Sequence, residues 1–431
     1  MPPEIGSEFH WDPAALSGGD ATWLPASHEL FATGCGALTA LLRFLGPRGR
    51  LHLPSYFCMG VAEALAAVIP IAFYRHLPDE GGPRWPSLRA AAGDMVLSQN
   101  LFGRDDPRPW DAWMRANPEV VIIEDHSHDP LSDWARTSQA SYAVASLRKT
   151  LPVPDGGLLW SPRGLDVPRP AGGESQGAQL KLAAMLLKAA WLDGRPIPKD
   201  DFRTLQQRGE HTLLGSEAPA SAFTAAVLPL LDAPSLRRSS LHNARALQTL
   251  LLRDHRSPAP RTAPTPSWAG PSKAPGYDNS EPSSTAAVAR TAPIPTRSEG
   301  PGLPGGGPVG MRSEGPGRPG AGPVGTRSGG WRLLGAGPFR AQLVCPSERV
   351  RDDLLRHLAA NGIYAPVHWR QDRTALWSGD EESADLAARM LTVPVDHRCS
   401  ATDVRRAAEV LLAFTDRQVE RRAAAGPPSA A

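Results

Sequence analysis

Residues 142–160 read YAVASLRKTLPVPDGGLLW, an apolar, strand-like run that ends near Lys149 and leads, six residues after that lysine, into Asp-Gly-Gly. Residues 120–128 read VVIIEDHSH, a second apolar run that ends in acidic and histidine side chains, Asp125 among them. Doubly wound sheets place their ligand-binding groups at the carboxyl ends of their strands. The two segments therefore offer an amine and a carboxylate at the edge of a sheet.

Apolar runs of strand length alternate with helical ones through the first 160 residues. The predicted helices cover residues 37–45, 60–68 and 109–116, and the predicted strands cover residues 50–54, 69–74, 94–98, 119–124, 142–146 and 157–160. Parallel strands need crossover connections, so this alternation predicts an α/β fold, a mainly parallel sheet with helices on both faces. Residues 180–192 have leucine and methionine at helical spacing, which predicts an amphipathic helix whose apolar stripe is core or a dimer contact.

The composition changes abruptly between residues 256 and 330, where Pro, Gly, Ser, Thr and Arg dominate and residues 297–311 are nearly repeated at 312–326. So few apolar side chains cannot offset the roughly 1–2 kcal/mol per residue that ordering the chain costs, and we expect a disordered insertion. A passive linker is the expected role, with recruitment of a partner as the alternative.

The insertion separates two expected domains of the chain. Residues 1–250 form a large domain that carries both quoted segments, residues 331–416 form a small C-terminal α+β domain, and residues 417–431 form a flexible tail. Within the small domain the pattern predicts strands at 339–344, 363–368 and 390–394 and helices at 347–361 and 401–414.

Composition and charge exclude several classes of protein. The 431 residues carry a formal charge of +2 and are 41% hydrophobic, which suffices for a substantial core. No basic block with interleaved aromatics supports nucleic-acid binding. The N-terminus lacks a charged leader with an apolar run, and no apolar stretch approaches a membrane span, so we expect a cytoplasmic protein. The four cysteines are scattered, without the Cys-x-x-Cys spacing of a zinc site, and no metal is expected.

Lys149 and Asp125 have the chemistry that pyridoxal phosphate requires. A lysine amine forms a Schiff base with the aldehyde of this cofactor when it is partly desolvated, as at a strand-to-loop position. The cofactor acts as an electron sink while its ring nitrogen stays protonated, which a carboxylate opposite the lysine would ensure. The alternative for each residue alone is a strand-end charge, with Lys149 in a solvated basic corner and Asp125 capping a turn.

Further segments carry patterns in a characteristic order along the chain. They are Gly34-Cys35-Gly36-Ala37 at the opening of a helix, Pro-Ser-Tyr-Phe-Cys at residues 54–58, Gln-Asn-Leu-Phe-Gly at residues 99–103, and two small-domain strands at 362–369 and 391–395. Together they resemble the DegT/DnrJ/EryC1/StrS family of pyridoxal phosphate-dependent, fold type I sugar aminotransferases. The resemblance implies a fold type I transferase that works as a homodimer, with active sites at the subunit boundary.

The resemblance assigns the start of the first predicted helix to the cofactor phosphate. Its residues are Gly34, Cys35, Gly36 and Ala37. Unpaired amides and the helix dipole favour an anion there, and a plain turn before a helix is the alternative. The family places a serine five residues before the lysine, where this chain has Val144. Ser146, three residues before Lys149, is the serine expected to reach the phosphate instead.

The resemblance also assigns residues to the cofactor ring. Tyr56 or Phe57 would stack on the pyridine, because a flat aromatic face fits a flat heterocycle; as the alternative, this aromatic belongs to the core. His128, three residues past Asp125, matches a family Gln or His that hydrogen-bonds the phenolic oxygen, with a satisfied surface histidine as the alternative. The Tyr-Asn-x-Arg-Met segment that helps build the family's substrate site has no match near residues 210–215.

The expected function is that of a pyridoxal phosphate-dependent aminotransferase. Lys149 would bind the cofactor and act as general acid and base, while Asp125 would keep the ring nitrogen protonated. The resemblance suggests glutamate as the amino donor and a keto-sugar, nucleotide-linked, as the keto acceptor. Two alternatives are a dehydratase, or another carbanion reaction with the same cofactor and lysine, and a non-catalytic descendant of the fold that serves as a binding or regulatory module.

Overall fold

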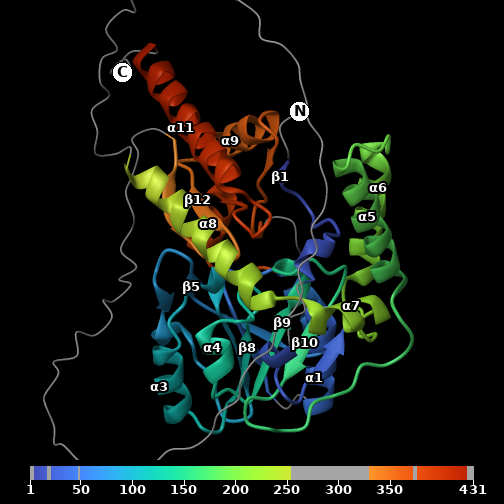
Figure 1. Ribbon diagram of the computed structural model, residues 1–431. Coiled ribbons are helices and arrows are strands. Elements are labelled where there is room, and N and C mark those ends of the chain that lie inside the picture. Colours follow the sequence, from blue (N-terminus) through green and yellow to red (C-terminus); the bar gives the residue numbers. More distant parts are fainter. Residues whose placement is uncertain (1–3, 17–20, 47–48, 254–329, 372–375, 425–431) are drawn as a thin grey trace, which may run out of the picture. The chain divides into compact units, whose positions relative to one another are not determined.

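The computed structural model describes residues 4–16, 21–46, 49–253, 330–371 and 376–424, all within one compact unit of the chain (Figure 1). The predicted insertion, apart from Gly330, and residues 425–431 of the predicted tail lie outside the described residues. Within the described part of the chain, no helix is long and apolar enough to cross a membrane.

A seven-stranded sheet, called the large sheet below, confirms the expected α/β class. Its strand order is β2-β10-β9-β8-β7-β3-β4. The bounds are β2 Glu29–Phe31, β3 Leu51–Pro54, β4 Ile71–Tyr74, β7 Met95–Gln99, β8 Val121–Asp125, β9 Tyr142–Ser146 and β10 Gly157–Trp160. The strands from β9 to β4 pair in parallel, whereas β10 pairs antiparallel with both β9 and β2.

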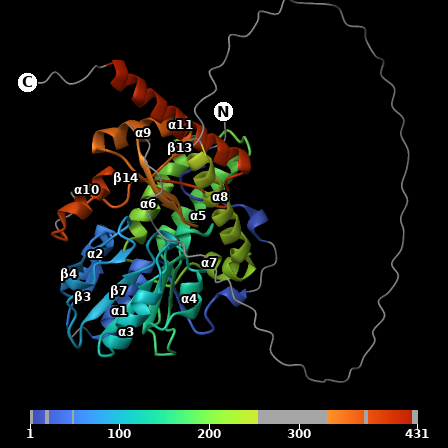
Figure 2. The same cartoon turned by 90° about the vertical axis from the view of Figure 1, so that its left-hand side faces the viewer.

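Apolar side chains cover both faces of the large sheet. Leu97 and Ile123 pack with helices α1 and α2, whereas their neighbours Val96 and Ile122 pack with tryptophans of α3 and α4. These helices are α1 Gly34–Leu45, α2 Met59–Ala66, α3 Arg108–Ala116 and α4 Asp133–Thr137. Because helices cover both faces (Figure 2), the central strands are continuous apolar runs in the sequence.

Packing explains the Asp-Gly-Gly of the quoted stretch. β10 begins at Gly157, where a Cβ atom would overlap the backbone of Thr33 and lie 2.6 Å from the backbone nitrogen of Gly34. Asp155 is fully buried, and its carboxylate accepts hydrogen bonds of 2.7 Å from both the N–H and the hydroxyl of Ser221, at the start of α7 (Ala222–Val227). This motif therefore brings β10 against the start of α1 and holds Ser221, the residue that caps α7.

A helical pair and a small antiparallel sheet follow the large sheet along the chain. The pair consists of α5 (Gln176–Leu192) and α6 (Lys199–Leu213), which lie side by side (Figure 1). The small sheet has the order β11-β12-β14, with bounds β11 Arg332–Ala336, β12 Ala341–Val344 and β14 Met390–Val393. One face packs on α8 (Ala233–Arg253), α9 (Glu348–Ala360) and α11 (Ala401–Ala424). The other face contacts Tyr56 and Phe102 at the edge of the large sheet.

Several elements differ from the sequence predictions. Helices α6 and α8 have no counterpart among them. In place of the strand predicted at 363–368, the structure has only the two-residue strand β13 (Ile363–Tyr364), which pairs in parallel with β1 (Ile5–Gly6). The ladder does not extend through Pro366, because proline has no N–H to donate. Helix α11 continues to Ala424, beyond the predicted end at residue 414 and into the predicted tail. The remaining helix and strands are α10 Glu381–Arg389, β5 His76–Leu77 and β6 Gly82–Pro83.

Candidate active site

The carboxyl ends of β8 and β9 bring Lys149 and Asp125 to the same edge of the large sheet. Asp125 is the last residue of β8 and is paired in register with Val144 of the parallel strand β9. Lys149 ends a short 3₁₀ turn, η5 (Leu147–Lys149), that follows β9 directly. The residue before it, Arg148, holds this turn to α6 through a bidentate ion pair with Glu210, with N–O distances of 2.7 and 2.6 Å.

Trp369, in the loop after β13, lies among the predicted site residues. Its ring centroid is 5.5 Å from that of Tyr56, 6.5 Å from that of Phe57 and 5.6 Å from that of His128. The Nζ atom of Lys149 lies 5.8 Å from the same centroid. In the sequence, Trp369 is only the last residue of a segment that resembles a small-domain strand, and no local signal indicates these contacts.

One carboxylate oxygen of Asp125 accepts a hydrogen bond from the backbone of the same turn. The side chain is 6% exposed, and its Oδ1 accepts a hydrogen bond of 2.8 Å from the N–H of Ser127. The hydroxyl of Ser127 in turn accepts a bond of 2.9 Å from the N–H of Ser146. Asp125 therefore caps a turn, as the alternative interpretation had it, and this turn fixes the carboxylate at the end of β8.

His128 is buried with one ring nitrogen unpaired. Its Nδ1 accepts a hydrogen bond of 2.9 Å from the N–H of Phe102, so in the neutral ring the proton is on Nε2. Nε2 is buried and has no hydrogen-bond partner among the described residues. Burial, helped by the charge of Lys149, lowers the pKa of His128 well below its usual value, so the ring stays neutral at pH 7. The ring stacks on that of Phe339, with centroids 4.4 Å apart.

The start of α1 has two amides available for an anion. Thr33 caps the helix: its hydroxyl accepts a bond of 2.9 Å from the N–H of Gly36, and its carbonyl accepts one of 3.0 Å from the N–H of Ala37. The amides of Gly34 and Cys35, in the first turn, have no intrahelical acceptor. Ser146 lies beside this turn, 3.3 Å from where a Cβ of Gly34 would be. Of the four predicted phosphate amides, two are thus engaged in the cap.

Tyr56 and Phe57 are both almost fully buried, at 1% and 2% exposure. The hydroxyl of Tyr56 donates a hydrogen bond to the carbonyl oxygen of His368, so this side chain joins the large-sheet edge to the small-sheet side of the site. Phe57 belongs to the core cluster between the large sheet and α1. Both therefore have core roles, and the contact of both rings with Trp369 keeps them at the site.

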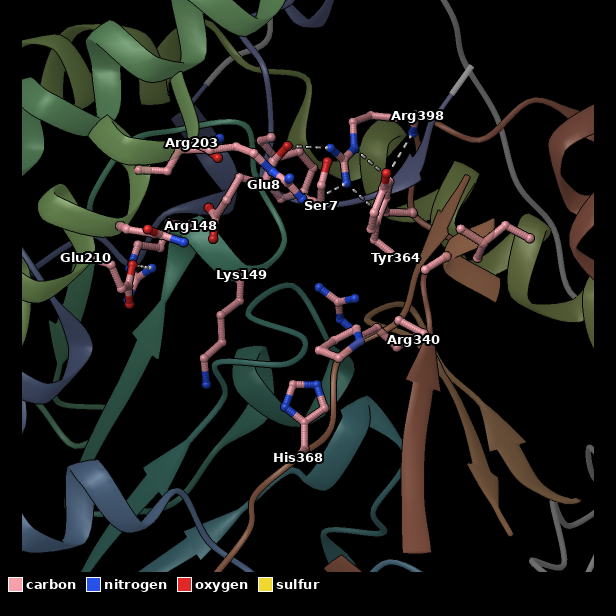
Figure 3. A pocket seen from close by; sticks show the side chains of 18 of the residues that line it. Ser7, Glu8, Arg148, Lys149, Arg203, Glu210, Arg340, Tyr364, His368 and Arg398 are labelled. Atoms are coloured by element: carbon pink, nitrogen blue, oxygen red, sulfur yellow. Dashed lines mark hydrogen bonds and ion pairs between the residues drawn. The ribbon is translucent and has the colours of Figure 1, made fainter. Parts of the chain in front are cut away.

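A cavity of about 1280 Å³ opens beside Lys149 (Figure 3). Residues 7–9 contribute to its wall, together with side chains from α6, the β11–β12 hairpin and the segment from Ile363 to His368. Burial raises the pKa of the Glu210 carboxyl at its side, but the charges of Arg148 and Lys181 outweigh this and lower it to about 2. Helix α6 lines the cavity here, and its last residues are 210–213. They belong to the stretch in which this sequence has no match to the Tyr-Asn-x-Arg-Met segment.

No family model and no curated protein matches this chain. Spr1654 from Streptococcus pneumoniae, a candidate sugar aminotransferase solved in its PMP-form, aligns at a TM-score of 0.54 and 11% identity over 96% of this chain and 93% of its own. The aminotransferase TlmJ from Streptoalloteichus hindustanus aligns at 0.54 and 15% identity, over 94% and 89%. DesI, solved in the presence of its TDP-sugar product, aligns at 0.53 and 14% identity, over 96% and 85%. The chain therefore has the fold of these aminotransferases, the fold type I class predicted from the sequence.

Proposed function

We propose that this chain is a pyridoxal phosphate-dependent aminotransferase of the DegT/DnrJ/EryC1/StrS family, which moves an amino group from glutamate to a nucleotide-linked keto-sugar. The observation that supports the proposal most is that Lys149 and Asp125 follow the carboxyl ends of the neighbouring strands β9 and β8, with the buried, unpaired Nε2 of His128 three residues past Asp125. The similar structures support it, since they are described as aminotransferases and DesI is described with a TDP-sugar product.

The described residues fit this cofactor at three points. The first-turn amides of Gly34 and Cys35, with the neighbouring Ser146, would hold the phosphate at a helix N-terminus. The buried Nε2–H of His128 lacks an acceptor and would donate to the phenolic oxygen. Asp125 would accept a hydrogen bond from the protonated ring nitrogen. An unpaired buried donor costs about 1–3 kcal/mol, which a bound acceptor would offset.

Lys149 and Asp125 have separate roles in the proposed chemistry. Pyridoxal phosphate, when bound, supplies an electron-accepting ring that stabilises negative charge at a carbon losing its proton. Nζ of Lys149 would attach the cofactor and, once the amino donor has displaced it, would take up that proton and return it to a neighbouring atom. Asp125 would keep the proton on the ring nitrogen, and the Trp369 ring, 5.8 Å from Nζ, would keep water from one side of the amine.

The proposal includes a cytoplasmic homodimer. Leu186 on α5 is exposed, and the proposal places it in the contact between the two copies. Light scattering of the purified full chain measures its mass in solution, and replacement of Leu186 by Glu should shift a dimer toward the monomer.

Absorption spectroscopy tests the cofactor directly. Purified protein with added pyridoxal phosphate should show the visible band of lysine-bound cofactor, and this band should be absent in both Lys149→Ala and Lys149→Arg. The arginine variant is the matched control, because it keeps the positive charge but cannot form the covalent bond. A wild-type chain that fails to bind the cofactor would refute the proposal.

Half-reactions decide between the proposed activity and its alternatives. Glutamate should convert the cofactor to its pyridoxamine form, and a nucleotide-linked keto-sugar should reverse the change. Cofactor binding without conversion by any amino donor would favour a dehydratase or a related carbanion reaction instead.

A further inference from the structure

A series of charged side chains joins the N-terminal segment to the turn that carries Lys149. Lys181 on α5 is 3% exposed, and its Nζ lies 3.2 Å from a carboxylate oxygen of Glu8 and 2.7 Å from one of Glu210 on α6. Glu210 in turn holds Arg148 through the bidentate ion pair. Figure 3 shows Glu8, Glu210 and Arg148 in the cavity wall beside Lys149. The contacts therefore run from Glu8 through Lys181 and Glu210 to Arg148, the residue before Lys149.

Close packing of α5 on α6 sets the position of the Lys181 side chain. The two helices approach each other at Gly177 and Gly209, where a Cβ on Gly209 would lie 2.6 Å from Cγ of Lys181 and 2.9 Å from the carbonyl oxygen of Gly177. A residue without a side chain leaves the space that this approach requires. The stem of Lys181 therefore lies over Gly209, and its amine meets the carboxylate of the next residue, Glu210.

Lys181 and Arg148 share one carboxylate oxygen. Oε2 of Glu210 accepts a hydrogen bond of 2.7 Å from each of them. Burial raises the pKa of the Glu8 carboxyl, but the charges of Lys181 and Arg148 outweigh this and lower it, so Glu8 and Glu210 are both ionised at pH 7. Without the Lys181 amine the two carboxylates would repel each other, and a buried pair that loses one partner leaves an uncompensated charge. Glu210 would then shift relative to Arg148.

We propose that Lys181 is a positioning residue for Lys149: through Glu210 it fixes Arg148, and so it sets the place of the turn η5 that carries the Lys149 amine. The inference rests on the proposed function, in which this amine reacts, and deepens it. Lys149 is the last residue of the turn, so a shift of Arg148 moves the base of the lysine side chain. A displacement of about 1 Å at a reacting group can lower the rate about 100-fold.

The rate of conversion to the pyridoxamine form tests this role in the cofactor-loaded protein. Lys181→Met should lower the rate at saturating amino donor about 10-fold or more and change the half-saturating concentration less than about 3-fold, because Lys181 positions the amine and does not bind the donor. Lys181→Arg should recover part of the rate, since a guanidinium can also bridge two carboxylates.

Lys188→Met is the matched control and should keep the wild-type rate. Lys188 is 2% exposed and lies two turns further along α5, where it donates to the hydroxyl of Ser7 and to the carbonyl oxygen of Glu8. It therefore holds the same N-terminal segment as Lys181, but at the backbone and at a neighbouring hydroxyl. An equal loss of rate in Lys188→Met and Lys181→Met would indicate a general loosening of α5 and overturn the proposal.

A double-mutant cycle shows whether the effect of Lys181 passes through Glu210. Glu210→Gln should lower the rate as Lys181→Met does, and it keeps the proposal testable if Lys181→Met fails to fold. In the Glu210→Gln protein, Lys181→Met should lower the rate less than about 2-fold further, because the link is already broken. Additive losses, or a wild-type rate in Glu210→Gln, would overturn the proposal.

Hydrogen exchange of the cofactor-free protein does not depend on the proposed function. Lys181→Met should speed exchange in residues 147–151, whereas Lys188→Met should speed it only in residues 5–9. Unchanged exchange in residues 147–151 of Lys181→Met would refute the positioning role, whatever the activity. A chain that shows the expected exchange but fails to bind the cofactor would contradict the proposed function and support the link from Lys181 to the turn.

Discussion

Replacement of Gly157 by alanine adds one methyl group at the point where β10 meets the start of α1. The new Cβ would overlap the backbone carbonyl of Thr33 and lie 2.6 Å from the nitrogen of Gly34, whereas real Cβ atoms essentially never approach other atoms within 3.0 Å. Backbone atoms cannot rotate away as a flexible side chain does. Relief therefore requires the strand and the helix start to move apart.

The expected cost is at the upper end of the range for overpacking, about 3 kcal/mol in the free energy of unfolding. Urea denaturation followed by circular dichroism measures it. Gly60→Ala is the matched control, since Gly60 lies inside α2 and a Cβ there would meet nothing within 4 Å. That variant should be stabilised by up to about 1 kcal/mol, because alanine is the better helix former.

The same substitution also tests the proposed phosphate site. Displacement of Gly34 would move the first-turn amides and should weaken cofactor binding in Gly157→Ala but not in Gly60→Ala. A Gly157→Ala protein as stable as wild type would show that the helix start adapts freely, and the reasoning about this close approach would be wrong. A loss of stability with unchanged cofactor affinity would support the packing argument and contradict the proposed phosphate site.

Three further outcomes follow from the contacts of single groups. The lowered pKa of Glu210 means that its ion pair with Arg148 stabilises the fold above about pH 4.5 and is lost as the pH falls toward about 2, so Glu210→Gln should flatten the pH dependence of unfolding in that range. Burial raises the pKa of the Cys35 thiol to about 11, so it should react with a thiol reagent at pH 8 far more slowly in the native protein than in urea. Tyr56→Phe removes the hydrogen bond to the carbonyl of His368 and should cost about 1 kcal/mol, measured by urea denaturation.

The parts of the site that the sequence predicts are those that follow apolar strands directly. Lys149 and Asp125 come just after two such runs, and parallel pairing of β8 with β9 puts both at one sheet edge. Apolar runs and their ends can be recognised in the local sequence, because a strand that is buried on both faces requires a continuous apolar run. For the same reason the central strands of the large sheet were predicted within a few residues of their observed bounds.

The parts that the sequence does not predict depend on contacts between distant segments. Arg340 and Trp369 come from the small-sheet side of the chain, and nothing in their local sequence indicates that they face Lys149. The cap at Thr33 is a local signal, and it explains why the amides of Gly36 and Ala37 are engaged although the glycine-rich turn suggested four available donors.

Several unfavourable features lie at or beside the edge that carries Lys149. Phe102 has φ +56°, a left-handed conformation that costs a bulky residue about 1–3 kcal/mol, and its N–H fixes the His128 ring with a buried Nε2 that lacks an acceptor. His368 and Arg340 have buried nitrogens in the same condition. A region that served only to stabilise the fold would pair these groups or replace them by apolar side chains of similar size. The charge of Lys149 acts on both histidines, so a polar, anionic ligand bound beside this lysine would offset these costs, which favours a binding site over a non-catalytic core.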